Sequence, residues 1–271
     1  MILRGIAHVH SRWSYDGCHD MKEIAAFAHG QALDFVLMSE HNRTLSDATM
    51  ATFVAECDAL TRATGVLMVP GIECEATPDY VHVLGYGVRA LVRDRHVDAI
   101  TAAVHAAGGF AVLAHPLYRD AAGHVGSADL ERLDGWEVWN AKADGCWYPS
   151  DAAVRRLVEL RRRGAGLVPM AGADLHRIEA DPRLILEVTC PAREAAAILA
   201  ALARRAYRVK GRMWTFVASD PLREPPRTPQ RVAAAAALDV RRRTRHVHAW
   251  VARHGLRAPA PLVHAARRLL K

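Results

Sequence analysis

Histidine and carboxylate side chains recur in this chain at the points where short apolar segments end. His8 and His10 close the first segment, and Asp174 and His176 follow the seventh. Because residues i and i+2 of a strand project from the same face, each pair is able to reach one ion at a ligand distance of about 2.0–2.1 Å. Neutral imidazole and carboxylate oxygen are ligands that zinc, manganese and iron(II) take. The spacing therefore indicates a metal site.

Side chains of the same two kinds end the segments in between. One histidine in a strand is usually an ordinary hydrogen-bonded residue, but six at strand ends call for another explanation. The carboxyl ends of strands in a parallel α/β protein form its active face, so we expect these side chains to converge there. The additional members of the set are Asp16, His41, Glu73, His82 and His115.

The elements that would position these residues alternate regularly up to about residue 220. Apolar residues spaced three and four apart predict helices, and short apolar runs predict strands. Strand and helix repeated in this way are typical of a parallel α/β fold. The predicted strands are Ile2–Val9, Asp34–Ser39, Val66–Glu73, Val81–Val88, Phe110–Ala114, Gly135–Trp139 and Leu167–Ala171, and the predicted helices are Met21–Leu33, Ser46–Thr64, Val97–Ala107 and Ser150–Arg163.

Two segments depart from this alternation. The connection Ala76–Tyr80 is too short for a crossover helix and predicts a turn, so the strands on either side should form a hairpin. The Pro-rich stretch 220–229 predicts a break before a helical tail. We therefore expect two parts, a barrel over residues 1–220 and a linker with a basic helical tail over residues 221–271.

Seven short motifs, taken in order, resemble those of the PHP (polymerase and histidinol phosphatase) superfamily over about residues 3–220. As a set they are highly specific. The resemblance implies a distorted seven-stranded β/α barrel whose open face binds up to three ions, commonly zinc, manganese or iron, and hydrolyses phosphoesters. The motifs are His8-Val-His10, Ser14-Tyr-Asp16-Gly, Ser39-Glu-His41-Asn, Pro70-Gly-Ile-Glu73, His82-Val-Leu-Gly-Tyr, Ala114-His115-Pro116 and Gly172-Ala-Asp174-Leu-His176.

The resemblance also implies a distribution of ligands and a mechanism. A water that bridges two ions would be held among His8, His10, Glu73, Asp174 and His176 and would attack as hydroxide. Glu40 is expected to orient one of the ligands from behind. Asp16 stands where many members have a histidine, and His19 and Asp20 follow in the same loop. The implied sets are His8, His10, Glu73 and Asp174 on a first metal, Asp16, His41 and His176 on a second, and Glu73, His82 and His115 on a third, with Glu73 bridging.

Basic side chains near these motifs favour a phosphorylated substrate. The positive charge of three divalent ions exceeds the negative charge of the three carboxylates in the set, so the site would favour a phosphate dianion as ligand. The arginine guanidinium matches phosphate oxygens as a bidentate donor. The candidate substrate-binding residues are Arg12, Arg43, Arg119 and Arg177, with Lys142 and Lys210 as weaker candidates in a chain that has only four lysines.

Composition excludes several classes of protein. The 271 residues are 51% hydrophobic and 24% charged, which is typical of a globular protein and not of a disordered or collagen-like one. We find no apolar run of the roughly 20 residues that a membrane span needs, and no export signal. The five cysteines are scattered and never form C-x-x-C, which argues against a disulfide framework and favours a reducing cytoplasm.

The formal charge of +7 is concentrated at one end of the chain. Residues 221–271 hold twelve Lys and Arg against two acidic residues, so the rest of the chain has a slight acidic excess. The main prediction is a small phosphorylated metabolite or nucleotide as substrate, with no membrane partner and no indication of oligomeric state. Two alternatives stay open: an amide or ester hydrolase with the same metal cluster, and a nuclease or nucleic-acid module whose basic tail grips the backbone, which the acidic body disfavours.

Overall fold

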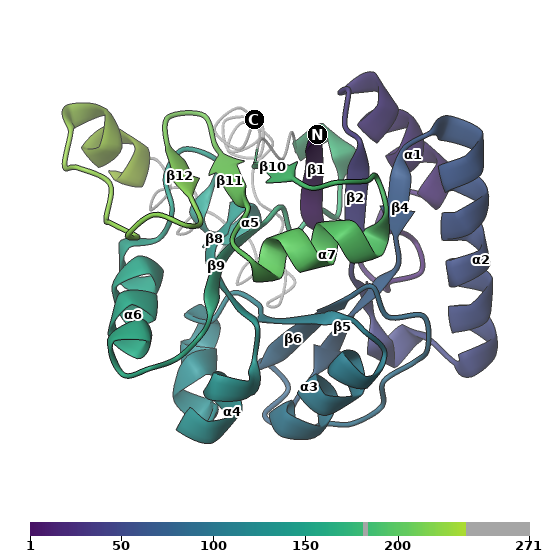
Figure 1. Cartoon of the computed structure of the whole chain (residues 1–271), viewed down its shortest axis with the longest axis horizontal. Helices are drawn as coiled ribbons and strands as arrows, with labels where there is room; N and C mark the ends of the chain where they lie inside the picture. Colours follow the sequence, from purple (N-terminus) through teal and green to yellow (C-terminus); the bar gives the residue numbers. More distant parts are fainter. Residues whose placement is uncertain (181–183, 237–271) are drawn as a thin grey trace, which may run out of the picture. The chain divides into compact units, whose positions relative to one another are not determined.

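Twelve strands form two mixed sheets in the part of the chain that the computed structural model describes, residues 1–180 and 184–236. The first sheet has the order β12-β11-β10-β1-β2-β4, and the second has the order β3-β5-β6-β7-β8-β9. Helices α1, α2, α3, α4 and α6 surround the strands from outside, and α7 crosses the middle of the view (Figure 1). The chain divides into two units, Met1–Pro225 and Pro226–Lys271, and the first unit is called the body below.

The strands of the body are short and mostly buried. Those of the first sheet are β1 (Ile2–Val9), β2 (Phe35–Met38), β4 (Leu67–Val69), β10 (Ile185–Thr189), β11 (Tyr207–Lys210) and β12 (Thr215–Val217). Those of the second are β3 (Glu40–His41), β5 (Gly71–Glu75), β6 (His82–Tyr86), β7 (Phe110–Leu113), β8 (Gly135–Asn140) and β9 (Val168–Gly172).

The predicted helices form close to their predicted bounds. Asp20 and Glu23 form a capping box at the start of α1, and Ser46 and Thr49 do the same for α2. Gly65 ends α2 in the left-handed conformation that glycine adopts without steric cost. The helices are α1 (Met21–Gly30), α2 (Asp47–Thr64), α3 (Val97–Ala106), α4 (Ser127–Arg132), α5 (Ala141–Asp144), α6 (Asp151–Arg162) and α7 (Ala195–Ala203), with 3₁₀ turns η1 (Asn42–Thr44), η2 (Tyr118–His124) and η3 (Ile178–Ala180).

The expected parallel seven-stranded barrel is not confirmed. Parallel pairing joins β1 to β2, β2 to β4, β3 to β5, β7 to β8, and β8 to β9, but the other pairs are antiparallel. The sheets do not close into one ladder. They meet where the chain passes from β2 to β3, where it passes from β4 to β5, and where Val9 bridges Leu175. A mixed α/β body results, and the predicted hairpin is present as β5 and β6.

The predicted strand Val66–Glu73 is split into β4 and β5, which belong to different sheets. Pro70 lies between them and has no N–H to continue a ladder. A Cβ on Gly71 would lie 2.2 Å from the carbonyl oxygen of Met38, so only glycine permits this close approach of the two chains. The split matters for the site, because it places the residues after Pro70, including Glu73, in the second sheet.

Three strands were absent from the sequence prediction. β10, β11 and β12 extend the first sheet by antiparallel pairing beyond β1. In β11 the side chains alternate between the two faces of the sheet: Val209 is buried, whereas Arg208 and Lys210 are exposed. No described helix is long and apolar enough to span a bilayer. Most of the predicted basic tail lies outside the described residues, and the predicted domain bounds at 220 and 221 stay predictions.

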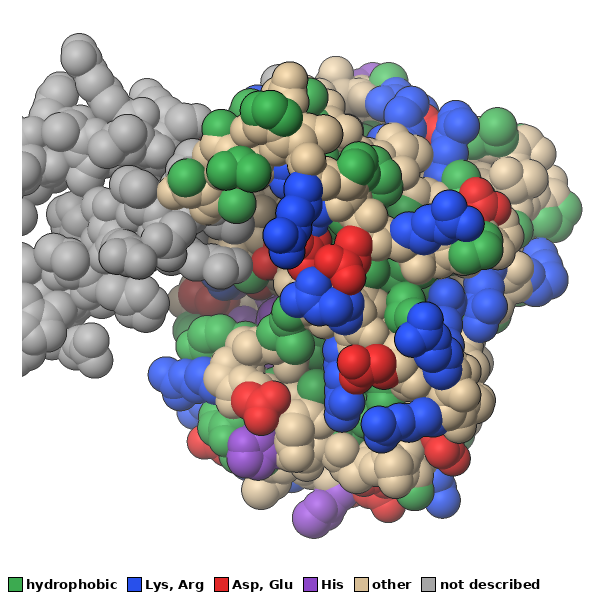
Figure 2. Space-filling view, turned by 90° about the vertical axis from the view of Figure 1, so that its left-hand side faces the viewer, with side chains coloured by type: hydrophobic (Ala, Val, Ile, Leu, Met, Phe, Trp, Pro, Cys, Tyr) green, Lys and Arg blue, Asp and Glu red, His purple; other side chains and the backbone are tan. Residues whose placement is uncertain are grey.

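The face of the body that carries α6 mixes both signs of charge. Figure 2 shows Lys and Arg side chains there interspersed with Asp and Glu. Arg155 lies 2.8 Å from Glu224, and Arg156 lies 3.3 Å from Glu159. Each of these two arginines thus has a carboxylate beside it.

Candidate metal centre

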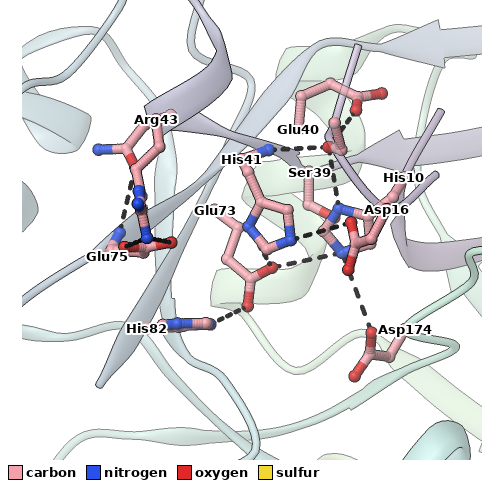
Figure 3. A network of polar contacts seen from close by, with 12 residues as sticks. His10, Asp16, Ser39, Glu40, His41, Arg43, Glu73, Glu75, His82 and Asp174 are labelled. Atoms are coloured by element: carbon pink, nitrogen blue, oxygen red, sulfur yellow. Dashed lines mark hydrogen bonds and ion pairs between the residues drawn. The ribbon is translucent and has the colours of Figure 1, made fainter. Parts of the chain in front are cut away.

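The buried carboxylate of Glu73 lies at the centre of the candidate site. Glu73 is the third residue of β5 and is 1% exposed. Its two oxygens face five imidazoles from four segments of the chain, and Figure 3 shows three of them, His10, His41 and His82. The distances from Glu73 Oε2 are 3.5 Å to His8 Nε2, 3.3 Å to His10 Nε2 and 3.4 Å to His41 Nδ1, and those from Oε1 are 2.7 Å to His82 Nδ1 and 3.1 Å to His115 Nε2.

Two further carboxylates join this cluster. Asp16 places Oδ1 3.4 Å from His41 Nε2 and Oδ2 2.8 Å from His176 Nε2. Asp174 Oδ1 lies 3.3 Å from His176 Nδ1 and 4.0 Å from Nε2 of both His8 and His10. The nine residues predicted as ligands thus form one connected group. Their binding of ions stays a prediction.

A β-bulge, not regular alternation, brings the His8 side chain to the centre. The pairing of β1 with β2 skips a residue between Ala7 and Val9, so His8 is the extra residue, with φ 62°. Leu175 N–H donates to His8 O at 2.9 Å, and His10 N–H donates to Leu175 O at 2.9 Å. These bonds place the first histidine pair beside the Asp174 and His176 pair.

Several buried nitrogen and oxygen atoms in the cluster have no hydrogen-bond partner. They are His8 Nε2, His10 Nε2, Asp16 Oδ1, His41 Nδ1 and His115 Nδ1. Unsatisfied buried polar atoms cost about 1–3 kcal/mol each, so a folded protein rarely tolerates several together unless a ligand takes them up. The donor set fits divalent ions. Three groups have ligand atoms within 4.8 Å of one another: His10 with Asp16, His41 and His176; His8 with Glu73 and His115; and His8 with His10 and Asp174.

Glu40 fixes the tautomer of His10 through a serine hydroxyl. Ser14 Oγ donates its single proton to Glu40 Oε2 at 2.6 Å, because the carboxylate only accepts. The hydroxyl therefore accepts from His10 Nδ1 at 3.3 Å, which leaves His10 Nε2 with a lone pair directed at Glu73. Ser11 also donates to Glu40 through its N–H and its hydroxyl. The orienting role that we expected for Glu40 stays a prediction.

Backbone carbonyls fix two other tautomers. His176 Nδ1 lies 2.9 Å from the carbonyl oxygen of Asp174, which only accepts, so Nδ1 carries a proton, and Nε2 is the nitrogen that lies 2.8 Å from Asp16 Oδ2. His82 Nε2 likewise lies 3.0 Å from the carbonyl oxygen of Asp79, so its Nδ1 is the atom presented to Glu73. In both rings a backbone carbonyl holds one nitrogen, so the other nitrogen is the one that could bind an ion once its own proton has left.

Charge coupling in the cluster shifts several pKa values. Burial would raise the pKa of Glu73, but His82 and His8 outweigh burial and hold this pKa well below its usual range. Burial alone would lower the pKa of His8, but Glu137 and Asp174 outweigh it and raise this pKa well above the ordinary value. For His10 burial dominates and lowers the pKa. The cluster therefore holds ionised carboxylates beside histidines of unequal basicity.

The four candidate arginines have different surroundings. Arg43 Nη1 donates to Glu75 Oε2 at 3.1 Å, and Glu75 is buried beside the site (Figure 3). Arg119 lies over the rings of Tyr118 and Tyr80, with its Cζ 5.4 and 6.0 Å from their centroids. Arg12 is exposed and donates from Nε to Cys18 O, and Arg177 is also exposed.

The two candidate lysines differ in position. Lys142 Nζ lies 3.2 Å from Asp174 Oδ1, inside the cluster, whereas Lys210 pairs with Glu187 at 3.1 Å. Two neighbours of Asp16 are engaged elsewhere: His19 pairs with Glu23 and Glu179, and Asp20 caps α1.

Sequence reasoning missed Glu137, which is buried on β8 and lies 2.9 Å from His8 Nδ1. It also missed Tyr15, whose ring stacks on that of His41 at 4.7 Å. The signal for Glu137 was an acidic residue between Trp136 and Trp139 in a predicted core strand. Both tryptophans are fully buried, so a charged residue between them needs a polar reason to be there.

Comparison with known proteins finds likeness at the level of structure. No protein-family model and no curated protein matches the sequence. A two-domain protein from Bacteroides vulgatus that contains a predicted PHP-like metal-dependent phosphoesterase superposes with a TM-score of 0.59 at 15% identity, over 78% of this chain and 65% of that one. The chain has a PHP-like fold.

Two other solved structures share this PHP-like fold. PsfC from Pseudomonas syringae has a TM-score of 0.52 at 18% identity, over 90% of this chain and 98% of that one. The lesion-specific endonuclease PfuEndoQ from Pyrococcus furiosus has a TM-score of 0.51 at 14% identity, over 75% of this chain and 56% of that one. The chain thus spans less than two thirds of the Bacteroides protein and of the endonuclease.

Proposed function

We propose that the chain is a metal-dependent hydrolase that cleaves phosphoesters of small phosphorylated metabolites or nucleotides. One observation carries the proposal: five imidazoles surround the carboxylate of Glu73, Asp16, Asp174 and a sixth imidazole join them, and several buried atoms of this group have no hydrogen-bond partner. This donor set suits up to three zinc, manganese or iron ions. The Bacteroides protein, which contains a predicted PHP-like metal-dependent phosphoesterase, supports the same class of reaction.

The ions would be held by His8, His10, Asp16, His41, Glu73, His82, His115, Asp174 and His176. When bound as a close pair, divalent ions lower the pKa of a shared water and neutralise charge on the attacking and leaving oxygens of a phosphoryl group. No serine or cysteine nucleophile is then needed.

Cationic side chains would bind the phosphate itself. Glu75 holds the Arg43 guanidinium at the site through Nη1, so less side-chain entropy is lost when phosphate binds. Lys142 Nζ lies 3.2 Å from Asp174 Oδ1 and would bring a second cation to the cluster. Arg12, Arg119 and Arg177 stay candidate substrate contacts.

The alternatives concern the bond that is cleaved. The same donor set could activate water against an amide or an ester, since carboxylates and imidazoles do not select the electrophile. The endonuclease that shares the fold, together with the Arg-rich segment 241–245, favours a nuclease as the second candidate. The paired charges on the α6 face weigh against a broad nucleic-acid surface.

A substrate screen separates these candidates. Protein loaded with manganese, zinc or iron(II) is offered phosphomonoesters, nucleoside bisphosphates, short oligonucleotides and amides. We expect turnover of small phosphoesters that is lost in His10→Ala and retained in His29→Ala, because His29 is exposed on α1 away from the cluster. Turnover of amides alone would overturn the proposal. Turnover of oligonucleotides alone, steeply weakened by salt, would favour the nuclease.

A further inference from the structure

The carboxylate of Glu137 connects three of the candidate metal ligands from behind. Glu137 is 2% exposed in β8, and its Oε1 lies 2.9 Å from His8 Nδ1. Its Oε2 accepts the backbone N–H of His115 at 2.7 Å and the side-chain amide of Asn140 at 2.9 Å. The same Asn140 amide donates to Asp174 Oδ2 at 3.1 Å. One buried charge thus contacts His8 and His115 directly and reaches Asp174 through Asn140.

Proton assignment follows from these contacts. An ionised carboxylate only accepts, so His8 Nδ1 must carry the proton that lies between it and Glu137. His8 Nε2, one of the buried atoms without a hydrogen-bond partner, is then the atom that presents a lone pair to the cluster. A carboxylate behind a ligating imidazole both fixes the ring orientation and increases its basicity.

The residues tied to Glu137 are also the strained ones. Among the nine candidate ligands, those with left-handed backbone are His8 at φ 62°, His115 at φ 27° and Asp174 at φ 48°. Such a conformation costs of order 1–3 kcal/mol for a residue with a side chain, and it persists only where surrounding contacts hold it. The hydrogen bonds of Glu137 and Asn140 reach all three, which explains how the strain is held.

A glycine makes room for this arrangement. A Cβ added to Gly172 would lie 1.9 Å from Glu137 Oε1 and 2.7 Å from His8 Cβ. Gly172 ends β9 with a φ outside the left-handed region. Glycine is therefore required here because it lacks a Cβ, and not because of its backbone conformation. The Glu137 carboxylate therefore occupies the space that a side chain at position 172 would fill, where β8 pairs with β9.

We propose that Glu137 is a positioning residue for the metal centre, which sets the tautomer of His8 and, with Asn140, holds His115 and Asp174 in the conformation that binds ions. This inference rests on the proposed function, because it assumes that the cluster binds metal. It adds a buried anion that neither touches the ions nor appears among the predicted ligands.

The test is Glu137→Gln, which keeps the shape and removes the charge. If the amide oxygen takes the N–H groups of His115 and Asn140, the amide NH₂ faces His8 Nδ1 and drives the proton to Nε2. We expect a 10–100-fold loss of affinity for Zn²⁺ or Mn²⁺, measured by titration calorimetry on metal-free protein, and a changed visible spectrum of the Co²⁺-loaded protein. The matched control is Glu187→Gln, which removes a carboxylate of similar exposure from β10, where it pairs with Arg208 and Lys210.

Two further variants keep the test decisive. Asn140→Ser keeps a residue able to cap α5 but removes the amide donor to Asp174, so we expect a several-fold loss of affinity from it even if Glu137→Gln does not fold. Gly172→Ala should also weaken metal binding, because its Cβ would displace both the Glu137 carboxylate and His8.

The outcomes separate the inference from the function it rests on. A folded Glu137→Gln protein with wild-type affinity and an unchanged Co²⁺ spectrum would overturn the inference. If Glu137→Gln does not fold, wild-type affinity in Asn140→Ser would overturn it instead. Wild-type protein that binds no metal would overturn the proposed function itself.

Discussion

The imidazole of His176 lies 2.8 Å from the carboxylate of Asp16, although 160 residues separate them in the chain. The N–H of Cys18 donates to the carbonyl oxygen of His176 at 3.0 Å, so the backbones of the two segments are tied as well. The loop after β1 is thereby fixed against the segment after β9. Asp16 reaches His41 from the same loop, at 3.4 Å.

Asp16→Asn should remove one ion from the centre. The carboxylate is the only anion in the group formed with His10, His41 and His176, so its loss leaves three neutral ligands and a weaker site. We expect the bound metal, measured by elemental analysis after dialysis, to fall by about one ion per chain. Asp98→Asn, an exposed change on α3, is the control. Unchanged metal content would mean that Asp16 is not a ligand.

Ser14→Ala should destabilise the fold. The hydroxyl donates to the fully buried Glu40 and accepts from the N–H of His41, and removing it leaves both partners short of a bond. A lost bond to a buried charge costs about 1–3 kcal/mol in the free energy of unfolding. Urea denaturation of the metal-free protein measures this, with exposed Ser219→Ala as the reference. Equal stability of the two variants would show that Glu40 has other support.

Arg43→Ala should weaken substrate binding more than turnover. Arg43 is held by Glu75 at the edge of the cluster, where a phosphate oxygen would accept from its guanidinium. One charge-assisted bond is worth about 1.5–3 kcal/mol, so we expect KM for an active phosphoester to rise about tenfold or more with kcat little changed. Arg89→Ala removes a similar surface ion pair, with Asp58, and should leave KM unchanged. A loss in kcat alone would exclude simple phosphate binding.

Metal binding should release protons. In the metal-free protein burial lowers the pKa of His8, but Glu137 and Asp174 outweigh burial and raise this pKa above its ordinary value of 6.5, so His8 keeps a second proton, on Nε2, near neutral pH. An ion can bind only after this proton leaves, and apparent affinity must therefore rise as pH increases from about 6.5 upward. Calorimetry in buffers of different ionisation enthalpy counts the protons. Equal heats in all buffers would contradict the assignment.

The raised pKa also predicts how stability depends on pH. A group with a raised pKa in the folded state adds stability that is present below its unfolded pKa and is lost as pH rises through its folded pKa. Metal-free protein should thus lose the His8 contribution above pH 6.5, whereas metal-loaded protein should not. Thermal denaturation with and without metal across pH 6–9 checks this, and parallel curves would contradict it.

The residues that gather in the site could be found from the sequence because their types and positions repeat. Six histidines at predicted strand ends point to one face, and that inference needs only the order of the elements, not their bounds. The hairpin of β5 and β6 was also predictable, since Ala76–Tyr80 is too short for a crossover. The helices followed from apolar residues three and four apart, and the starts of two of them coincide with the capping residues Asp20 and Ser46 in the structure.

What the sequence did not reveal depends on contacts between distant segments. The bulge at His8 is visible only against the register of β2, and the role of Glu137 depends on space that Gly172 leaves on another strand. The strands β10 to β12 were missed because they are short, with four residues in β11 and three in β12. Pro70 could have been read as a break between sheets, since proline interrupts a central strand.

Anomalous X-ray scattering from crystals soaked in Zn²⁺ or Mn²⁺ tests the central claim most directly. We predict peaks at the absorption edge of the metal within ligand distance of Glu73 and among His8, His10 and His115, with a further peak beside Asp16 and His176. A loaded crystal whose peaks lie only on surface histidines such as His29, with none near Glu73, would contradict the account.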